Sequence, residues 1–138
     1  MSDGPEITYC TNPEVMNDEL NALFEAAWTE HQRRDYTPVL ARSLAYVCAY
    51  TEADLVGFVN LAWDGGVHAF LLDTTVHPDF QRRGIGTQLV RRAVGLAEAE
   101  GIEWVHVDFE PHLRDFYTGC GFSPTEAGLV RCRAAGSG

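Results

Sequence analysis

The segment that most constrains the fold of this chain is residues 76–87, where a strand pattern gives way to a helix pattern. His77-Pro78 ends the strand, because proline has no amide hydrogen to donate to a β-ladder. Gly84 and Gly86 then lead into a run of apolar residues at helical spacing. The glycines let the backbone approach a ligand closely, and the first amides of a helix have no intrahelical partner. This strand–turn–helix pattern predicts an anion site at the start of the helix.

Two arginines in the same turn, Arg82 and Arg83, add cationic side chains that suit phosphate oxygens. Two familiar phosphate motifs do not fit. A dinucleotide-binding fingerprint needs a third glycine, which is missing after Gln88-Leu89, and a P-loop needs a lysine. All ten cationic residues of the chain are arginines. The turn therefore belongs to neither class of nucleotide site.

The whole chain reads as one mixed α/β domain over residues 1–138. Three β-rich segments in the middle are joined by short polar turns, which predicts three antiparallel strands side by side. Asn12-Pro13 is typical of a helix start and Gly101 of a helix end. Residues 134–138 are expected to be a frayed end. Strands are expected at 7–10, 45–51, 55–63, 67–76 and 104–109, one or two more between 122 and 133, and helices at 13–31, 38–45, 84–100 and 112–118.

The charge balance limits the classes of partner. Ten arginines stand against twenty acidic residues, a net charge of −10, so the protein repels a nucleic-acid backbone and an anionic membrane. Residues 81–92 nevertheless hold four arginines and no acid, so an anionic small molecule can still bind there. No stretch is long and apolar enough to span a bilayer. We therefore expect neither a nucleic-acid nor a membrane partner.

The four cysteines, Cys10, Cys48, Cys120 and Cys132, are scattered without the paired spacing of a zinc site. We therefore expect no metal. The start of the chain, MSDGPEITYC, lacks the charged and apolar parts of a signal peptide. Together these observations predict reduced thiols in a cytoplasmic protein.

Two motifs resemble those of a known family. QRRGIG at residues 81–86 is similar to the Q/R-x-x-G-x-G/A signature of the GNAT superfamily of acyl-CoA N-acyltransferases, and DTTVHP at residues 73–78 resembles the strand end that introduces it. FYTGCGF at residues 116–122 resembles the F-Y-x-x-x-G-F that closes the same fold. Both motifs stand in the expected order and spacing. The chain thus resembles a small, single-domain, bacterial-type member of this superfamily.

The resemblance implies a GNAT-like α/β fold with a central, mostly antiparallel sheet, splayed where coenzyme A binds and flanked by about four helices. It implies acetyl-CoA as co-substrate, without a metal, and pairing of the pantetheine arm with the backbone of Thr74, Thr75 and Val76. The Val76 amide would polarise the thioester carbonyl. Tyr117 matches the position that protonates the departing thiolate. The pyrophosphate is expected on the backbone amides of Arg82, Arg83, Gly84, Ile85, Gly86 and Thr87.

The motifs do not single out the group that accepts the amine proton. Asp73, Asp108, Glu110 and His112 all stand where strands are expected to end near the acyl group. The chain departs from the family here, because Asn is common seven residues before the tyrosine and Ala four before it, whereas Glu110 and Leu113 occupy those positions. Glu110 is a candidate base or amine anchor, and a solvated carboxylate is the alternative.

The amine acceptor stays open at the level of sequence. An acidic protein attracts cations, which favours a polyamine, an aromatic amine, an aminoglycoside or a peptide amine. The acceptor pocket is expected in residues 28–42, where Arg33 and Arg34 would suit a carboxylate-bearing acceptor instead. The other polar and aromatic residues of that cluster are Trp28, His31, Asp35 and Tyr36.

The leading hypothesis is an acetyl-CoA-dependent N-acetyltransferase that acetylates a primary amine of a small molecule or peptide, with Tyr117 as general acid and Glu110 as a second catalytic residue. O-acylation and a longer acyl donor are alternatives within the enzyme class. A non-catalytic acyl-CoA sensor and an interaction module with the same fold are alternatives outside it. The resemblance also raises a homodimer, because homodimers are common in the family.

Overall fold

The structure, a computed structural model, describes residues 5–133 of the chain. The predicted frayed end at residues 134–138 lies outside the described residues. The chain divides into two compact units, Met1–Val107 and Asp108–Gly138, and each is described by itself. The single domain expected from the sequence stays a prediction.

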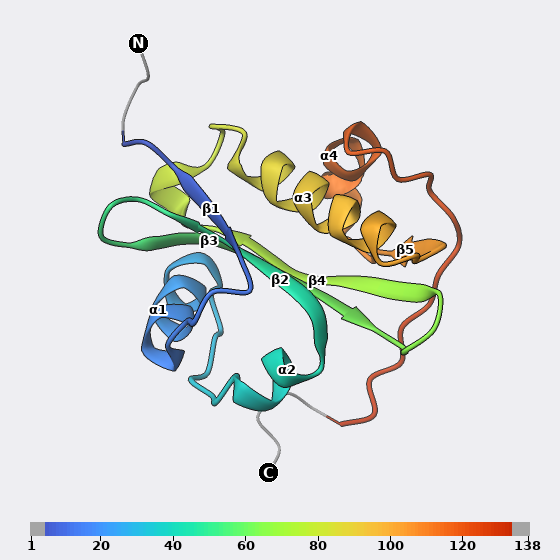
Figure 1. The fold of residues 1–138 in the computed structure, drawn as a ribbon, viewed down its shortest axis with the longest axis horizontal. Coiled ribbons are helices and arrows are strands. Elements are labelled where there is room, and N and C mark those ends of the chain that lie inside the picture. Colours follow the sequence, from blue (N-terminus) through green and yellow to red (C-terminus); the bar gives the residue numbers. More distant parts are fainter. Residues whose placement is uncertain (1–4, 134–138) are drawn as a thin grey trace. The chain divides into compact units, whose positions relative to one another are not determined.

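Unit 1 is built on a five-stranded sheet whose strands follow the order of the sequence (Figure 1). Neighbouring strands from β1 to β4 are antiparallel, and β5 runs parallel to β4. The three adjacent antiparallel strands predicted in the middle of the chain are therefore confirmed. Their β-branched and apolar composition suits a sheet covered on both faces. The strands are β1 (Thr8–Thr11), β2 (Ser43–Tyr50), β3 (Leu55–Trp63), β4 (His68–Val76) and β5 (Trp104–His106).

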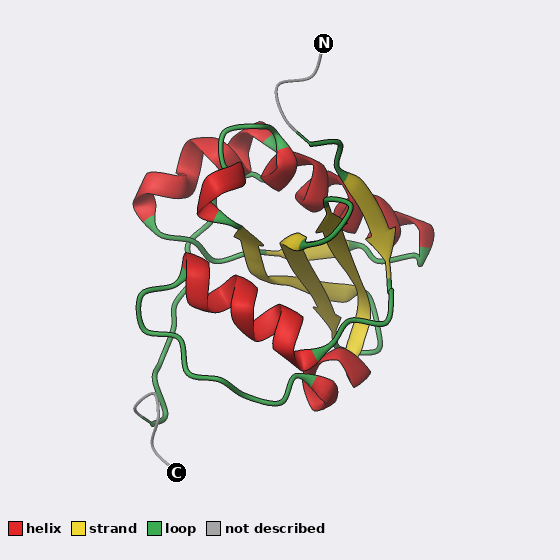
Figure 2. Cartoon of the chain, turned by 90° about the vertical axis from the view of Figure 1, so that its left-hand side faces the viewer, coloured by secondary structure: helices red, strands yellow, loops and turns green. Residues whose placement is uncertain are grey.

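Helices cover both faces of this sheet (Figure 2). Within the described residues of unit 1 they are α1 (Asn17–Ala27), α2 (Thr37–Ala41) and α3 (Ile85–Ala99). α3 lies on one face, and α1 and α2 lie on the other. On the α1 face, the ring of Phe24 meets those of Phe58 and Tyr36 edge to face, at 5.7 and 5.2 Å between centroids. Aromatic pairs of this kind add about 0.5–1.5 kcal/mol beyond the area they bury, so this cluster anchors α1 to the sheet.

The first helix is shorter than predicted. Asn12 does not cap it, because its φ is 53° and its side chain accepts a hydrogen bond from the Tyr46 amide at 2.9 Å. The Asn12 amide also donates to the Tyr46 carbonyl at 2.8 Å, so the residue extends the pairing of β1 with β2. The helix begins after Met16, whose amide donates to the Glu19 carboxylate at 3.1 Å. It ends where the backbone of Trp28 becomes extended.

Two other elements end early. α2 stops at Ala41 because β2 already begins at Ser43. β5 stops at His106, short of the predicted end at 109. By contrast, β3 has the predicted bounds, and α3 differs from its prediction by one residue at each end.

The described part of unit 2, residues 108–133, holds one 3₁₀ turn, Pro111–Leu113, followed by α4 (Arg114–Gly119), close to the helix predicted at 112–118. The strands predicted between 122 and 133 are not formed, and Leu129 and Val130 are 84% and 85% exposed. A strand needs a neighbour for its hydrogen bonds, and the described part of unit 2 contains no other strand. Counted over both units, the described residues hold four α-helices and one five-stranded, mostly antiparallel sheet, which confirms the predicted mixed α/β fold class.

α3 packs closely on the sheet because β3 carries Gly57. A methyl group added to Gly57 would lie 3.0 Å from Leu89, 3.1 Å from Ala49 and 3.2 Å from Ile85. Ile85 and Leu89 belong to the start of α3, and Gly57 pairs with Val76 at the end of β4. The missing side chain therefore sets where α3 begins relative to the end of β4.

We predict that Gly57→Ala lowers the free energy of unfolding by about 1–3 kcal/mol, because the added methyl group pushes α3 off the sheet. Gly95→Ala is the matched control. An added methyl group at Gly95, inside α3, meets no atom within 4 Å, so it should raise the stability by about 0.5–1 kcal/mol. Urea unfolding followed by circular dichroism measures both. An unchanged free energy of unfolding for Gly57→Ala would contradict the close packing.

Candidate functional site

β4 has an open edge on the side of β5. Three residues at the start of β4 pair with β5, whereas β4 continues to Val76. Residues 71–76 therefore have no partner in β5. The His77 amide donates to the Val56 carbonyl of β3 at 2.8 Å, and since amides alternate along a strand, the Val76 amide points to the open side. This open edge, residues 71–76, is a row of backbone groups with which an extended ligand can pair.

A β-bulge bends β4 at Asp73. The register with β3 slips between Phe58 and Asn60, so that Asp73 and Thr74 together face one residue of β3. Asp73 has a left-handed φ of 57°, and its carbonyl accepts a hydrogen bond from the Thr75 hydroxyl at 2.9 Å. A bulge bends its strand and increases the local twist. The bend follows the point where pairing with β5 stops, and it shapes the open edge.

The glycine turn between β4 and α3 gathers backbone amides in one place. Gln81 is extended, with a φ of −69° and a ψ of 160°, and Arg82 and Gly84 have left-handed φ values of 63° and 80°. Turns of this kind, directly before the free amides of a helix start, form concavities that bind anions. The Gln81 side chain donates to the Val76 carbonyl at 3.2 Å, which ties the turn to the open edge. The structure thus brings together the two segments predicted to bind acetyl-CoA, residues 74–76 and residues 82–87.

The two arginines of the turn are not equivalent. The Arg83 guanidinium donates to the Pro5 carbonyl at 3.0 Å and lies 5.4 Å from the centre of the Phe80 ring. These contacts draw its side chain toward the N-terminal segment. Arg82 is exposed at the centre of the turn. The sequence treated the two alike, and the structure distinguishes them.

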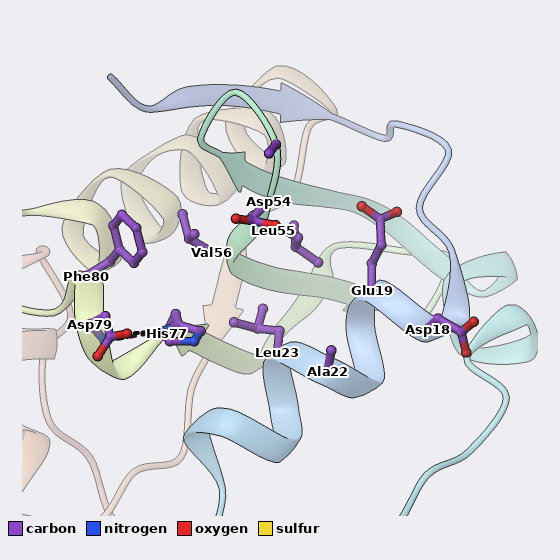
Figure 3. Close-up of a pocket in the computed structure, with 11 residues that line it drawn as sticks. Asp18, Glu19, Ala22, Leu23, Asp54, Leu55, Val56, His77, Asp79 and Phe80 are labelled. Atoms are coloured by element: carbon purple, nitrogen blue, oxygen red, sulfur yellow. Dashed lines mark hydrogen bonds and ion pairs between the residues drawn. The ribbon is translucent and has the colours of Figure 1, made fainter. Parts of the chain in front are cut away.

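A separate cleft of about 560 Å³ opens beside α1 (Figure 3). It is walled by α1, by the turn between β2 and β3, and by the residues that follow β4. Its lining includes the carboxylates of Asp18, Glu19, Asp54 and Asp79 and no arginine. Carboxylates repel a polyanion, so this cleft does not suit the phosphates of an acyl-CoA.

The first part of the predicted acceptor region, residues 28–36 between α1 and α2 and named the acceptor segment, is held in place by Asn21. The Asn21 side chain, 3% exposed, donates to the Arg34 carbonyl at 2.9 Å and accepts from the Arg34 amide at 3.0 Å. Its oxygen also accepts from Nε2 of His31 at 2.8 Å. Sequence reasoning missed Asn21, because nothing local marks a residue whose partners follow 10 and 13 positions later.

Two charged residues predicted to line the acceptor pocket have local partners. Arg33 forms ion pairs with Asp18 at 2.9 Å and Glu25 at 2.8 Å. Asp35 accepts a hydrogen bond from the Thr37 amide at 3.0 Å, which lowers its pKa. Both charges are therefore satisfied between α1 and α2.

Asp73, one of the four candidate bases, faces the acceptor segment. Its carboxylate interacts electrostatically with Arg34 and Tyr36. The side chain reaches solvent, yet the surrounding protein removes enough water to raise the pKa of Asp73, and Arg34 partly offsets this. Burial also lowers the pKa of His31 and raises that of Tyr36. An accessible, partly dehydrated carboxyl group can act as a base or bind an ammonium group.

The two predicted catalytic residues lie in unit 2. Tyr117 in α4 is 6% exposed, and its ring stacks on Phe109 at 5.0 Å and meets Phe122 edge to face at 5.9 Å. Glu110 is exposed, with its carboxylate 3.5 Å from the His112 ring. Ring packing fixes Tyr117 within its unit, whereas Glu110 is solvated. Their catalytic roles stay predictions.

Residues 5–133 contain no group of three or more His, Cys, Asp or Glu side chains arranged to hold a metal ion. Over the same range, no helix has both the length and the apolar character needed to cross a membrane. None of the four cysteines, all of which lie within residues 5–133, takes part in a disulfide.

The sequence is similar to acetyltransferases. A sequence model of the acetyltransferase (GNAT) family matches residues 14–122. The chain is 32% identical over 120 residues to a protein of Porphyra purpurea named uncharacterized N-acetyltransferase ycf52. The matched segment covers 83% of this chain and 69% of that protein. It is 35% identical over 66 residues to a mycothiol acetyltransferase of Mycolicibacterium vanbaalenii, which covers 48% of this chain and 22% of that longer protein.

The fold is similar to that of a solved GNAT family acetyltransferase from Streptococcus pneumoniae TIGR4. The TM-score is 0.77 at 24% sequence identity, over 93% of this chain and 100% of that one. At this identity the likeness concerns the fold alone.

We predict that Asp73→Asn raises the melting temperature near pH 7 and has no such effect below about pH 4. Because the pKa of Asp73 is raised, the folded state holds its proton more tightly than the unfolded state. The free energy of unfolding therefore falls as the pH rises from the pKa of Asp73 in the unfolded state to its pKa in the folded state. Asparagine does not ionise, so the variant does not lose this stability. Asparagine also tolerates the left-handed φ of 57°. Thermal unfolding from pH 3 to pH 8 measures the effect, and a lower melting temperature at pH 7 would contradict a dehydrated carboxylate.

Proposed function

Because the chain belongs to the GNAT family of acetyltransferases, we propose that it transfers the acetyl group of acetyl-CoA to a primary amine. The observation that supports this most is the open edge of β4, which ends beside the glycine turn. An extended row of backbone groups next to a concavity of amides suits a ligand with an amide-bearing arm and a pyrophosphate. Acetyl-CoA has both.

In this proposal the pyrophosphate lies on the amides of residues 82–87, at the positive end of the α3 dipole. A charge at a helix N-terminus is stabilised by about 0.3–1 kcal/mol when exposed and up to ~2 kcal/mol when partly buried. The exposed Arg82 side chain adds a cation. The pantetheine arm pairs with residues 74–76 as an added strand, which brings the thioester carbonyl to the Val76 amide.

The reaction needs a base, an oxyanion donor and an acid. The acceptor enters as an ammonium ion and gives one proton to Asp73 or Glu110. Its nitrogen attacks the thioester carbon, and the Val76 amide donates to the oxyanion; loss of one such donor typically costs about 10²–10³ in rate. As the C–S bond breaks, Tyr117 protonates the thiolate. The second proton lost by the nitrogen, as the amide forms, restores Tyr117.

The cytoplasmic location and the homodimer belong to the same proposal. The net charge of −10 supports the exclusion of nucleic acids and anionic membranes as partners. The proposed reaction uses no metal ion.

We predict that Gly84→Val weakens acetyl-CoA binding at least about tenfold, because a β-branched residue resists the left-handed conformation and turns the amides away from the phosphates. Gly101→Val is the matched control. Gly101 has a φ of 78° and Gly84 one of 80°, and an added Cβ at either position would meet no atom within 4 Å. Gly101, however, follows the C-terminal end of α3, away from the proposed phosphate site. Calorimetry should therefore show near-native acetyl-CoA affinity for Gly101→Val. Equal affinities for the two variants would mean that the phosphate site is misplaced.

We predict that the protein releases thiol from acetyl-CoA in the presence of a primary amine, and that Tyr117→Phe lowers kcat about 10²-fold at unchanged acetyl-CoA affinity. Phenylalanine keeps the ring that packs on Phe109 and removes only the hydroxyl. Tyr9→Phe, which removes a hydroxyl from β1, is the control and should keep full activity. A thiol-release assay over a panel of amines measures the rates.

Two results would contradict parts of this proposal. An unchanged kcat for Tyr117→Phe would remove the general-acid role. Acetyl-CoA binding without thiol release above hydrolysis for any amine would favour the non-catalytic sensor.

A further inference from the structure

Building on the proposed function, we infer that the acceptor is an amine with an aromatic body, which lies on an exposed face of β4 and β5 while its ammonium group reaches Asp73. This β4–β5 face consists of Phe70 and Leu72 of β4 and of Trp104 and His106 of β5.

The four side chains share one side of the sheet. Side chains alternate along a strand, so Phe70 and Leu72 lie opposite Ala69 and Leu71, which are buried at 0% and 3% exposure. Phe70 pairs with His106 across the parallel ladder, and their rings stack at 5.0 Å. Trp104 precedes His106 by two positions and therefore faces the same way.

The β4–β5 face is more exposed than apolar side chains of this size usually are. Phe70, Leu72 and Trp104 are 36%, 39% and 58% exposed. Contiguous apolar patches on a soluble protein typically mark a binding surface. Flat rings suit another aromatic ring, which they contact edge to face or offset, and they also attract a cation.

Asp73 stands at the end of this face. It follows Leu72 directly, and its carboxylate interacts with Arg34 and Tyr36, whose segment packs on α1. It therefore lies on the α1 side of the sheet, as the β4–β5 face does. At about 3.3 Å per residue, Phe70 is about 10 Å from Asp73 along the strand. This spacing fits an ammonium group joined to a ring by a short chain.

The charges nearby argue against the other acceptor classes. Of the two arginines that would suit a carboxylate-bearing acceptor, Arg33 is held by Asp18 and Glu25, and Arg34 interacts with the carboxylate of Asp73. A polyamine or an aminoglycoside has no flat aromatic ring to contact Phe70 and Trp104, so it gains less free energy on this face than an aromatic amine does. The net charge of −10 draws an ammonium ion toward the protein, and Asp73 supplies the local carboxylate.

The test measures acceptor binding separately from turnover. Protein saturated with coenzyme A is titrated with tryptamine, ethylamine and spermidine, and binding is followed by calorimetry and by amide chemical shifts. We expect tryptamine to bind at least about tenfold more tightly than ethylamine, because ethylamine lacks the ring. The amides of residues 70–73 should shift with tryptamine.

Three variants locate the contacts. Phe70→Ala should weaken tryptamine binding about fivefold or more and leave ethylamine unchanged, whereas Asp73→Asn should weaken both. Trp63→Ala is the matched control. Trp63 is 40% exposed and pairs with Ala69, so its ring lies on the opposite side of the sheet, and tryptamine affinity should stay within about twofold.

The outcomes separate this inference from the proposed function. Thiol release with ethylamine or spermidine as readily as with tryptamine, unaffected by Phe70→Ala, would overturn the aromatic acceptor and leave acetyl transfer standing. Tryptamine binding on the face without thiol release would support the inference while the transfer fails. Dissociation of a dimer by Phe70→Ala, with unchanged tryptamine affinity, would overturn the inference and make the face an interface between copies of this chain.

Discussion

The unpaired edge of β4 is the constraint on which the rest of the candidate site depends. Backbone amides and carbonyls need partners, and over residues 71–76 only the side facing β3 has them within the sheet. The bulge at Asp73 and the early end of β5 create this edge, and the hydrogen bond from Gln81 to Val76 holds the glycine turn against it. The proposed donor site is therefore made of backbone rather than of side chains, and a ligand that fills it must be extended and rich in hydrogen-bonding groups.

This site in turn depends on the core beneath it. The direction of the amides in the turn depends on how close the start of α3 lies to the sheet. The close approach of Ile85 and Leu89 to Gly57 sets this distance. A glycine in β3, 27 positions before Gly84, thus shapes the proposed phosphate site, which it does not touch. Stability and donor binding are coupled at this point, whereas the acceptor segment depends on a different residue, Asn21.

The sequence predicts what local patterns encode. A β-branched and aromatic composition between polar turns identified β3 with its bounds, and helical spacing with flanking glycines identified α3 and the turn before it. Contacts between distant residues were not predictable. Asn12 resembles a helix cap until Tyr46, 34 positions later, takes its side chain. The contact of Arg83 with the carbonyl of Pro5, 78 positions earlier, is equally invisible in the local sequence. The bulge at Asp73 likewise depends on the register with β3, which no single segment specifies.

The acceptor question, left open by the sequence, turns on how charge is distributed. Arg33 and Arg34 favoured a carboxylate ligand until the structure paired Arg33 with two acids and placed Arg34 beside Asp73. Although Arg34 is near, the pKa of Asp73 remains raised, so one guanidinium does not offset the water that the carboxylate has lost. An additional cation at Asp73 would therefore stabilise its ionised form. The partly dehydrated carboxylate of Asp73 stands at the end of the apolar β4–β5 face. This combination favours an acceptor that joins an ammonium ion to a flat apolar body.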